Sequence, residues 1–454
     1  MHHRFLPSSI LTTIIFSFLL LSAAAVQGQK VWTLQGCIDQ ALENNLALQR
    51  GDIDIQATEA RLKQAKLARW PNLSANTSYG LGFGRATNQD NITLTTNVSQ
   101  SQNYSVNSTV NLFSGFATSL NIRQNEALLE LSELTQDELR NAISLQVANA
   151  YLGVLLALED QKRAQTQLEL SQDNLANSQK LVDAGTIPEG NLRDLEAQVA
   201  TDQLGIINAS NTTSLAKLNL QLLMLVDENE FEVEIPADAV LEAILLTSTD
   251  WDPRAITEYA AANLPQFLAN DVAVTIEDFN VDLAKSARWP SIGLSGGINT
   301  TWFTVSDPPV PLPSYGDQLN DNLGQSVGIG IQIPIFSNGT TINNIRQAEF
   351  QRERILSSNQ EERNNLYQTI SQAVADAKAF QSSYNASVAV VEARQQALEF
   401  TERRFNAGQA VSFEFTNARN LLAAAQVDAI RAKYNYIFAI KVLDFYQGRS
   451  LTLD

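Results

Sequence analysis

The chain has 454 residues with 49 acidic and 31 basic side chains, a formal net charge of −18 at pH 7. A surface this acidic repels phosphate backbones, so we expect no nucleic acid partner. The only histidines, His2 and His3, stand at the extreme N-terminus. A chain that loses this end has no Ser-His-Asp triad, Cys-His pair or His-ligated zinc site, and we expect no catalytic residue, metal or cofactor.

Residues 1–28 have the pattern of an export signal. Polar and basic residues at 2–4 precede an apolar run from Ile10 to Leu21, and small residues follow. This order is typical of a secretory signal, and the run of about 12 residues is too short to span a bilayer as a helix. We expect cleavage near Gly28, with an uncleaved anchor as the alternative. No later window offers about 18 uncharged apolar residues, so we expect no transmembrane helix in the mature chain.

Cys37 ends the sequence Leu34-Gln35-Gly36-Cys37, which superficially matches a lipoprotein acylation box. The sequence lies well past the apolar run, and Gln35 fits the box poorly. Thr33 has the character of a helix N-cap, which would place Cys37 inside a helix that begins at Leu34. We expect a half-buried helical thiol, with lipidation as the alternative. A single cysteine allows no intrachain disulfide.

The mature sequence contains two copies of one pattern, repeat 1 at 29–226 and repeat 2 at 253–448. Four markers recur in the same order: Ala-Arg-Trp-Pro at 68–71 and 287–290, Phe-Ser at 113–114 and 336–337, Ile-Arg-Gln at 122–124 and 345–347, and Ala-Gly at 184–185 and 407–408. An internal duplication of this kind indicates two similar structural units. Residues 227–252 join the repeats, and 449–454 form a C-terminal tail.

Each repeat is expected to form a helix, two strands, a long helix, a tight turn and a return helix. Proline ends the first helix of each repeat, because it lacks an amide hydrogen and disfavours helical backbone dihedrals in the residue before it. In repeat 1 the expected elements are a helix at 34–69, strands at about 72–84 and 103–113, and helices at about 117–183 and 188–226. In repeat 2 they are a helix at about 254–288, strands at about 291–303 and 326–336, and helices at about 340–406 and 411–446. A short strand is expected at 231–236 between the repeats.

The four strands alternate like transmembrane strands. Leu73, Ala75, Tyr79 and Leu81 alternate with Asn, Ser and Gly residues, and the other three runs behave alike. Each run is about ten residues long, enough for a tilted strand to cross a bilayer. The polar face is almost uncharged, as a water-filled lumen would be. The alternative is a soluble antiparallel sheet with one dry and one wet face.

The long helices exceed the size of a globular domain. About 65 helical residues extend roughly 97 Å, and the apolar residues of both copies recur mostly at steps of four and three, a heptad seam. Gly185 and Gly408 follow the two long helices as C′ glycines. Four strands cannot close a barrel, since the smallest have about eight. At least two chains must therefore share one barrel, and three would supply twelve strands.

The chain resembles the TolC family of outer-membrane efflux and secretion channels over essentially all of its mature length. The resemblance rests on the paired Ala-Arg-Trp-Pro segments, on Phe113-Ser114-Gly115, on residues 404–408 (Arg-Phe-Asn-Ala-Gly) and on residues 432–436 (Ala-Lys-Tyr-Asn-Tyr). It implies an α+β membrane protein, a homotrimer with a twelve-stranded barrel in outer-membrane lipid and an α-helical coiled-coil barrel in the periplasm of a Gram-negative bacterium. It also implies a passive exit duct that a periplasmic adaptor protein and an inner-membrane transporter open.

The resemblance also implies two sets of site residues. Adaptor-docking tips map to Gly185, Thr186, Ile187, Gly408, Gln409 and Ala410. The periplasmic aperture maps to Asn191, Asp194, Glu414 and Asn417, so only half of its positions are acidic. Solvated helix charges are the alternative for Asp194 and Glu414. The alternative for the whole protein is a structural periplasmic coiled coil or a surface adhesin without a pore. The cargo (drug, metal ion or polypeptide) stays open.

Overall fold

The computed structural model describes residues 31–84, 97–185, 188–227, 231–246, 250–306, 308, 311–407 and 409–453. The expected export signal and its cleavage point lie outside these residues. The chain divides into two compact units. Unit 1 comprises Met1–Leu48, Leu139–Ala260 and Tyr367–Asp454, and unit 2 comprises Gln49–Glu138 and Ala261–Leu366. Each unit thus draws on both sequence repeats, and the helices α4 (Ala117–Asp183) and α10 (Thr340–Asn406) run through both.

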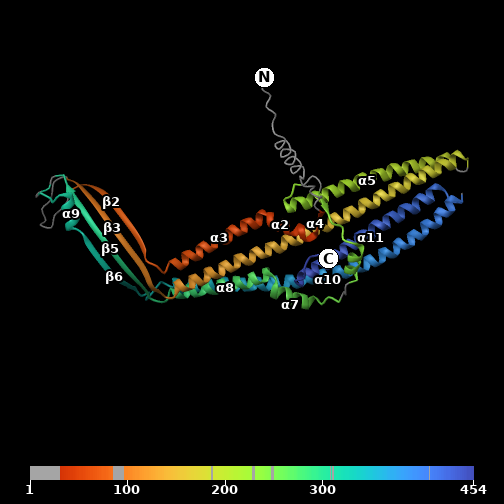
Figure 1. Cartoon of the computed structure of the whole chain (residues 1–454). Helices are drawn as coiled ribbons and strands as arrows, with labels where there is room; N and C mark the ends of the chain where they lie inside the picture. Colours follow the sequence, from red (N-terminus) through yellow and green to blue (C-terminus); the bar gives the residue numbers. More distant parts are fainter. Residues whose placement is uncertain are drawn as a thin grey trace, which may run out of the picture. The chain divides into compact units, whose positions relative to one another are not determined.

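Unit 2 contains one antiparallel sheet with the strand order β2-β3-β5-β6 (Figure 1). Its strands are β2 (Asn72–Gly84), β3 (Asn97–Ser114), β5 (Ser291–Val305) and β6 (Gly324–Gln332). The register aligns Val110 with Leu294 and Leu294 with Ile329, so apolar side chains of three strands share one face. Leu73 and Ile329 are 77% and 66% exposed. The sheet therefore carries an apolar face that unit 2 itself does not cover.

The observed elements of this region differ from the expected ones chiefly at one end of β3, at one end of β6 and in an additional helix. β3 begins at Asn97 rather than 103, because its pairing with β2 continues to Gly84. β6 ends at Gln332 rather than 336, and Pro334, which has no amide hydrogen for a strand ladder, follows two residues later. A helix that the sequence did not predict, α9 (Tyr315–Asp321), lies between β5 and β6, and the Ser314 hydroxyl caps it by accepting from the Asp317 amide at 3.3 Å.

The first helix of each repeat was expected as one element, and each is two. In repeat 1, α2 (Leu34–Asn44) and α3 (Leu46–Leu67) meet at Asn45, whose backbone is extended and whose side chain accepts from the Ala47 amide at 2.8 Å. In repeat 2, α7 (Pro253–Asn263) and α8 (Pro265–Ser286) meet at Leu264, because Pro265 holds the preceding residue extended. The two breaks lie 219 residues apart, the same offset that separates the two Ala-Arg-Trp-Pro segments.

Unit 1 contains two short parallel strands, β1 (Val31–Trp32) and β4 (Glu232–Val233). Its other elements are the return helices α5 (Glu189–Met224) and α11 (Ser412–Tyr446) and the helix α6 (Asp238–Leu245). The buried Tyr151 hydroxyl donates to the Glu234 carbonyl at 2.6 Å. The predicted N-cap at Thr33 is confirmed, since its hydroxyl accepts from the Gly36 amide at 3.0 Å. Cys37 is fully buried rather than half-buried.

The expectation that no segment after the export signal is long and apolar enough to span a bilayer is wrong for one stretch of α4. The helical residues Ala117–Lys180 contain an 18-residue window of mean hydropathy 1.4, half of it buried. Residues 141–158 indeed carry no charged side chain. In unit 1 this stretch places Val147, Val154 and Leu155 in the core at 1% exposure or less. Tertiary packing therefore accounts for its apolar character.

Candidate functional site

The backbone conformation of Gly185 ends the first long helix and forms the tip of the first hairpin. After α4 the Gly185 amide donates to the Val182 carbonyl at 2.8 Å, and Gly185 has φ +72°, the left-handed conformation that a C′ glycine supplies. Pro188 precedes α5 without a side-chain cap, and Glu189 in the first turn complements the positive end of the helix dipole. The predicted tip residues Thr186 and Ile187 lie outside the described residues.

The tip of the second hairpin is held by Arg404. Its guanidinium lies 3.3 Å from the Glu414 carboxylate and donates to the Gln409 carbonyl at 3.1 Å. The Gln409 backbone amide in turn donates a hydrogen bond of 2.8 Å to the Arg404 carbonyl. The rings of Phe405 and Phe415 stack at 5.2 Å, one from each arm of the hairpin. One arginine and one ring pair therefore fix both arms, while the predicted tip residue Gly408 lies outside the described residues and Ala410 is half-buried.

The four residues assigned to the aperture have unequal surroundings. Asn191 is half-buried, whereas Asp194, Glu414 and Asn417 are exposed. Among the described residues no hydrogen bond or ion pair joins the four side chains to one another. Glu414 is already paired with Arg404, so its negative charge is partly offset. Of these four residues, Asp194 carries the one carboxylate without such a partner in the part of the chain that the structure describes.

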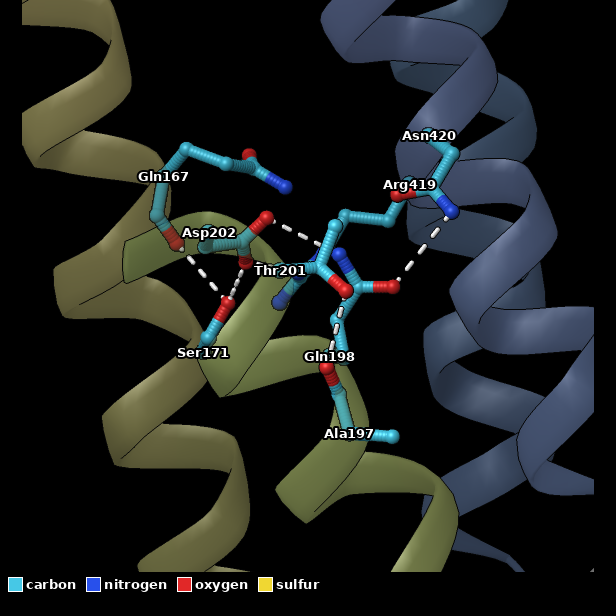
Figure 2. Close-up of polar contacts among 8 residues, drawn as sticks. All are labelled: Gln167, Ser171, Ala197, Gln198, Thr201, Asp202, Arg419 and Asn420. Carbon is cyan, nitrogen blue, oxygen red and sulfur yellow. Dashed lines mark hydrogen bonds and ion pairs between the residues drawn. The ribbon is translucent and has the colours of Figure 1, made fainter. Parts of the chain in front are cut away.

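A polar cluster that the sequence did not predict joins the two hairpins. Figure 2 shows Asp202 of α5 and Arg419 of α11 turned toward each other, and the two side chains lie 2.6 Å apart. They are only 9% and 4% exposed. The Asp202 carboxylate also accepts from the Ser171 hydroxyl of α4, and from the Gln198 amide at 2.9 Å. Side chains of three helices, drawn from both repeats, therefore meet at one carboxylate.

Burial dominates the electrostatics of this cluster. Removal from water lowers the pKa of Arg419 below its ordinary value, and the nearby Asp202 carboxylate acts in the opposite direction. A charged group in such a place depends on its partner, because breaking a buried pair leaves an uncompensated charge. The pair therefore couples α5 to α11 more tightly than an exposed ion pair would.

The sequence pattern does single out Asp202 and Arg419, although it does not pair them. On α5 the buried apolar residues Leu192 and Leu195 lie three positions apart, and Asp202 follows Leu195 two helical turns later; on α11 Arg419 follows the buried Phe415 by four positions. A charged residue on a helical stripe that is otherwise apolar requires a partner. The two residues are 217 positions apart, so the pattern marks each residue without pairing them.

The sequence profile of the family described as outer membrane efflux protein matches residues 37–224 and 257–449. The chain belongs to the outer membrane efflux protein family. The two matched stretches correspond to the two sequence repeats and leave out the segment that joins them.

Named relatives of this family cover most of the chain. The outer membrane efflux protein BepC of Brucella suis is 24% identical over 97% of this chain and 91% of BepC. The outer membrane protein TolC of Vibrio cholerae is 22% identical over 66% of both chains. The structure of CusC, described as forming a transmembrane channel, superposes with a TM-score of 0.77 at 18% identity over 92% of both chains.

These findings confirm the resemblance to the TolC family. They identify the fold as that of the family's channels, and the members of the family that they name are outer membrane efflux proteins and channels rather than enzymes. The family places the protein in the outer membrane of a Gram-negative bacterium, with the helical part in the periplasm.

Proposed function

We propose that the protein is the exit duct of a tripartite efflux or type I secretion system. The observation that carries the proposal is the sheet of unit 2. Among the described strands, β2 and β6 each pair on one side only. Lipid cannot satisfy the backbone groups of an open strand edge, and each unpaired group costs several kcal/mol. A lone protomer therefore cannot reside in the bilayer, and the edges must be closed by other copies of the chain.

A homotrimer closes the sheet with β6 of one protomer against β2 of the next. Three chains with four strands each give twelve strands. A barrel of this size is wider than one of about eight strands, which side chains can fill, so it encloses an aqueous lumen. The apolar face that carries Leu73 and Ile329 then meets lipid, and the face of Asn, Ser, Thr and Gly residues lines the channel.

The helices continue the duct through the periplasm. α4 and α10 have 67 residues each, a length of roughly 100 Å at about 1.5 Å per residue. Substrates pass passively, because the chain offers no nucleotide-binding loop. The energy for export then comes from an inner-membrane transporter.

The hairpin tips are the docking surface for a periplasmic adaptor. The tip residues assigned to this role are Gly185, Thr186, Ile187, Gly408, Gln409 and Ala410. Beside the second tip, Val411 and Phe413 are 57% and 73% exposed. Apolar side chains this exposed at a hairpin end support contact with a protein partner.

The aperture residues Asn191, Asp194, Glu414 and Asn417 line the resting entrance of the duct. The buried Asp202–Arg419 pair lies 17 residues beyond Gly185 on α5 and 11 beyond Gly408 on α11. This pair holds the two hairpins together at a fixed point. An adaptor that moves the tips apart therefore bends only the parts of the hairpins that lie between the tips and the pair. Opening then needs no separation of the helices farther along.

Two measurements on the purified protein test this function. The membrane-extracted protein should migrate as an oligomer on a gel without heating and as a monomer after heating. In a planar lipid bilayer it should give single-channel currents. A water-soluble monomer without conductance would refute the duct and favour a structural periplasmic coiled coil.

A further inference from the structure

The junctions between strand and long helix have the same unusual backbone in both repeats. Gly115 and Phe116 precede α4 with φ of +62° and +68°, and Asn338 and Gly339 precede α10 with φ of +48° and +79°. At the first junction a Cβ on Gly115 would lie 2.4 Å from the Ser286 carbonyl oxygen. The chain therefore passes directly over the end of α8, and only glycine permits this approach.

A cavity of about 390 Å³ lies at this junction, within unit 2. Part of its wall is aromatic. Phe116 and Trp289 are 62% and 57% exposed, and their ring centroids lie 6.5 Å apart. Phe113 continues the cluster at 5.3 Å from Phe116 and is paired in register with Ile292, on the apolar face of the sheet. The aromatic wall therefore extends that apolar face beyond the strand ends.

Apart from Gly115 and Leu120, the rest of the wall is polar and carries an excess positive charge. Arg123 and Lys285 line the cavity together with Asp282 and with Ser119 from the first turns of α4. Lys285 lies 3.3 Å from the Asp282 carboxylate, so these two charges offset each other. The exposed Arg123 guanidinium has no ion pair among the described side chains. The first amides of α4 add the positive end of a helix dipole.

We propose that this cavity binds the phosphate headgroup of a phospholipid from the leaflet next to the helices. The proposal rests on the proposed function, because it requires the sheet to lie in the outer membrane. The Arg123 guanidinium would donate hydrogen bonds to the phosphate oxygens, because its planar set of donors matches the geometry of a phosphate group. Phe116 and Trp289 would contact the glycerol and the first acyl carbons, because aromatic rings favour the headgroup layer.

The surroundings favour a lipid over other occupants. Free phosphate has no apolar part, whereas one side of the cavity is aromatic and continuous with the lipid-facing surface. A second copy of the chain is expected at the free edges of β2 and β6, whereas this cavity lies where the central strand β3 ends and the central strand β5 begins. The register pairs Ser114 with Ser291 at that end of the sheet.

Native mass spectrometry of the delipidated, detergent-solubilised oligomer tests the proposal with dioleoylphosphatidylglycerol as the probe. We expect Arg123→Gln to weaken retention of this lipid about tenfold, the effect of losing one charge-assisted hydrogen bond. Lys285→Gln should also weaken it, because Asp282 is then left to repel the phosphate. Arg394→Gln is the matched control: it removes an exposed arginine of α10 that does not line the cavity, and it should change nothing.

Two further probes identify which part of the lipid is bound. Dioleoylglycerol has the same acyl chains without phosphate and should not be retained, and inorganic phosphate should not displace the lipid. Equal retention by Arg123→Gln and the unaltered protein, retention of dioleoylglycerol, or displacement by phosphate would each overturn the proposal. Bilayer conductance of the same samples separates the failures, because a conducting channel that retains no phospholipid refutes this site alone.

Discussion

The Arg419 guanidinium donates to the Asp202 carboxylate at 2.6 Å, and this buried contact joins the return helices of the two repeats. The contact explains how two hairpins that belong to distant parts of the chain keep a fixed register. Ser171 and Gln198 also donate to this carboxylate, so Asp202 accepts hydrogen bonds from three side chains.

Arg419→Met should lower the free energy of unfolding by about 3–5 kcal/mol, because it leaves the Asp202 carboxylate buried without its cation. Thermal unfolding of the purified protein, followed by circular dichroism, measures the loss. The matched control is Arg193→Met on α5, whose ion pairs with Glu189 and Glu196 are largely exposed, and we expect a much smaller loss of stability there.

The double variant Asp202→Asn with Arg419→Met removes both charges and should recover part of the stability. If Arg419→Met proves no more destabilising than Arg193→Met, then the pair contributes as little as a surface ion pair, and its role in coupling the hairpins must be abandoned.

Tyr151 should make unit 1 sensitive to alkaline pH. Burial, more than the neighbouring Cys37 and Glu234, raises the pKa of its hydroxyl well above the ordinary value of 10.0. A raised pKa in the folded state means that stability is complete below pH 10 and is lost as pH rises above it, because the unfolded chain releases this proton first. The expected slope is about 1.4 kcal/mol per pH unit from this group.

Urea unfolding at a series of pH values above and below 10 measures this slope. Tyr151→Phe should lower the free energy of unfolding by about 1 kcal/mol at neutral pH, because it loses the hydrogen bond to the Glu234 carbonyl. Above pH 10 the free energy of unfolding of this variant should fall less steeply with pH, because one titrating proton has been removed. An unchanged slope would assign the alkaline sensitivity to other tyrosines, among which burial also raises the pKa of Tyr436 and Tyr446.

Much of the fold follows from local patterns in the sequence. Residue alternation and the Trp-Pro pairs predict β2 and β5 to begin where they do, at Asn72 and Ser291. The breaks at Asn45 and Leu264 escaped prediction, because a single extended residue hardly disturbs helical periodicity. Pro265 was a usable signal, since proline favours the first position of a helix. α9 escaped because it is short and follows a proline-rich segment.

The candidate site was less predictable than the fold. The position of each tip follows from its glycine, but the pairing of Arg404 with Glu414 depends on how the turn folds back. Asp202 and Arg419 are each conspicuous on a buried stripe, yet their pairing is a tertiary fact that no local pattern contains. The charge balance of the aperture therefore required the structure.

Gly115→Ala should disrupt assembly of the barrel. The added Cβ would lie 2.4 Å from the Ser286 carbonyl oxygen and 2.7 Å from the Trp289 Cβ, and alanine also disfavours the φ of +62°. The measurement is the yield of heat-modifiable oligomer in outer-membrane extracts. Gly330→Ala is the matched control within the same sheet, because a Cβ at that glycine meets nothing within 4 Å. Equal yields from the two variants would show that the junction can relax.

The two acidic aperture residues should contribute unequally to ion selectivity. Arg404 lies 3.3 Å from Glu414 and offsets its charge, whereas Asp194 is exposed and is not paired with any described side chain. Asp194→Asn should therefore reduce the cation preference of the resting channel more than Glu414→Gln does. Arg404→Gln should increase the preference, because it releases the Glu414 carboxylate. Reversal potentials across a planar bilayer under a potassium chloride gradient measure all three, and Asn417→Ala serves as an uncharged control. If Asp194→Asn and Glu414→Gln together leave resting conductance, cation preference and block by divalent cations unchanged, these residues do not line the aperture.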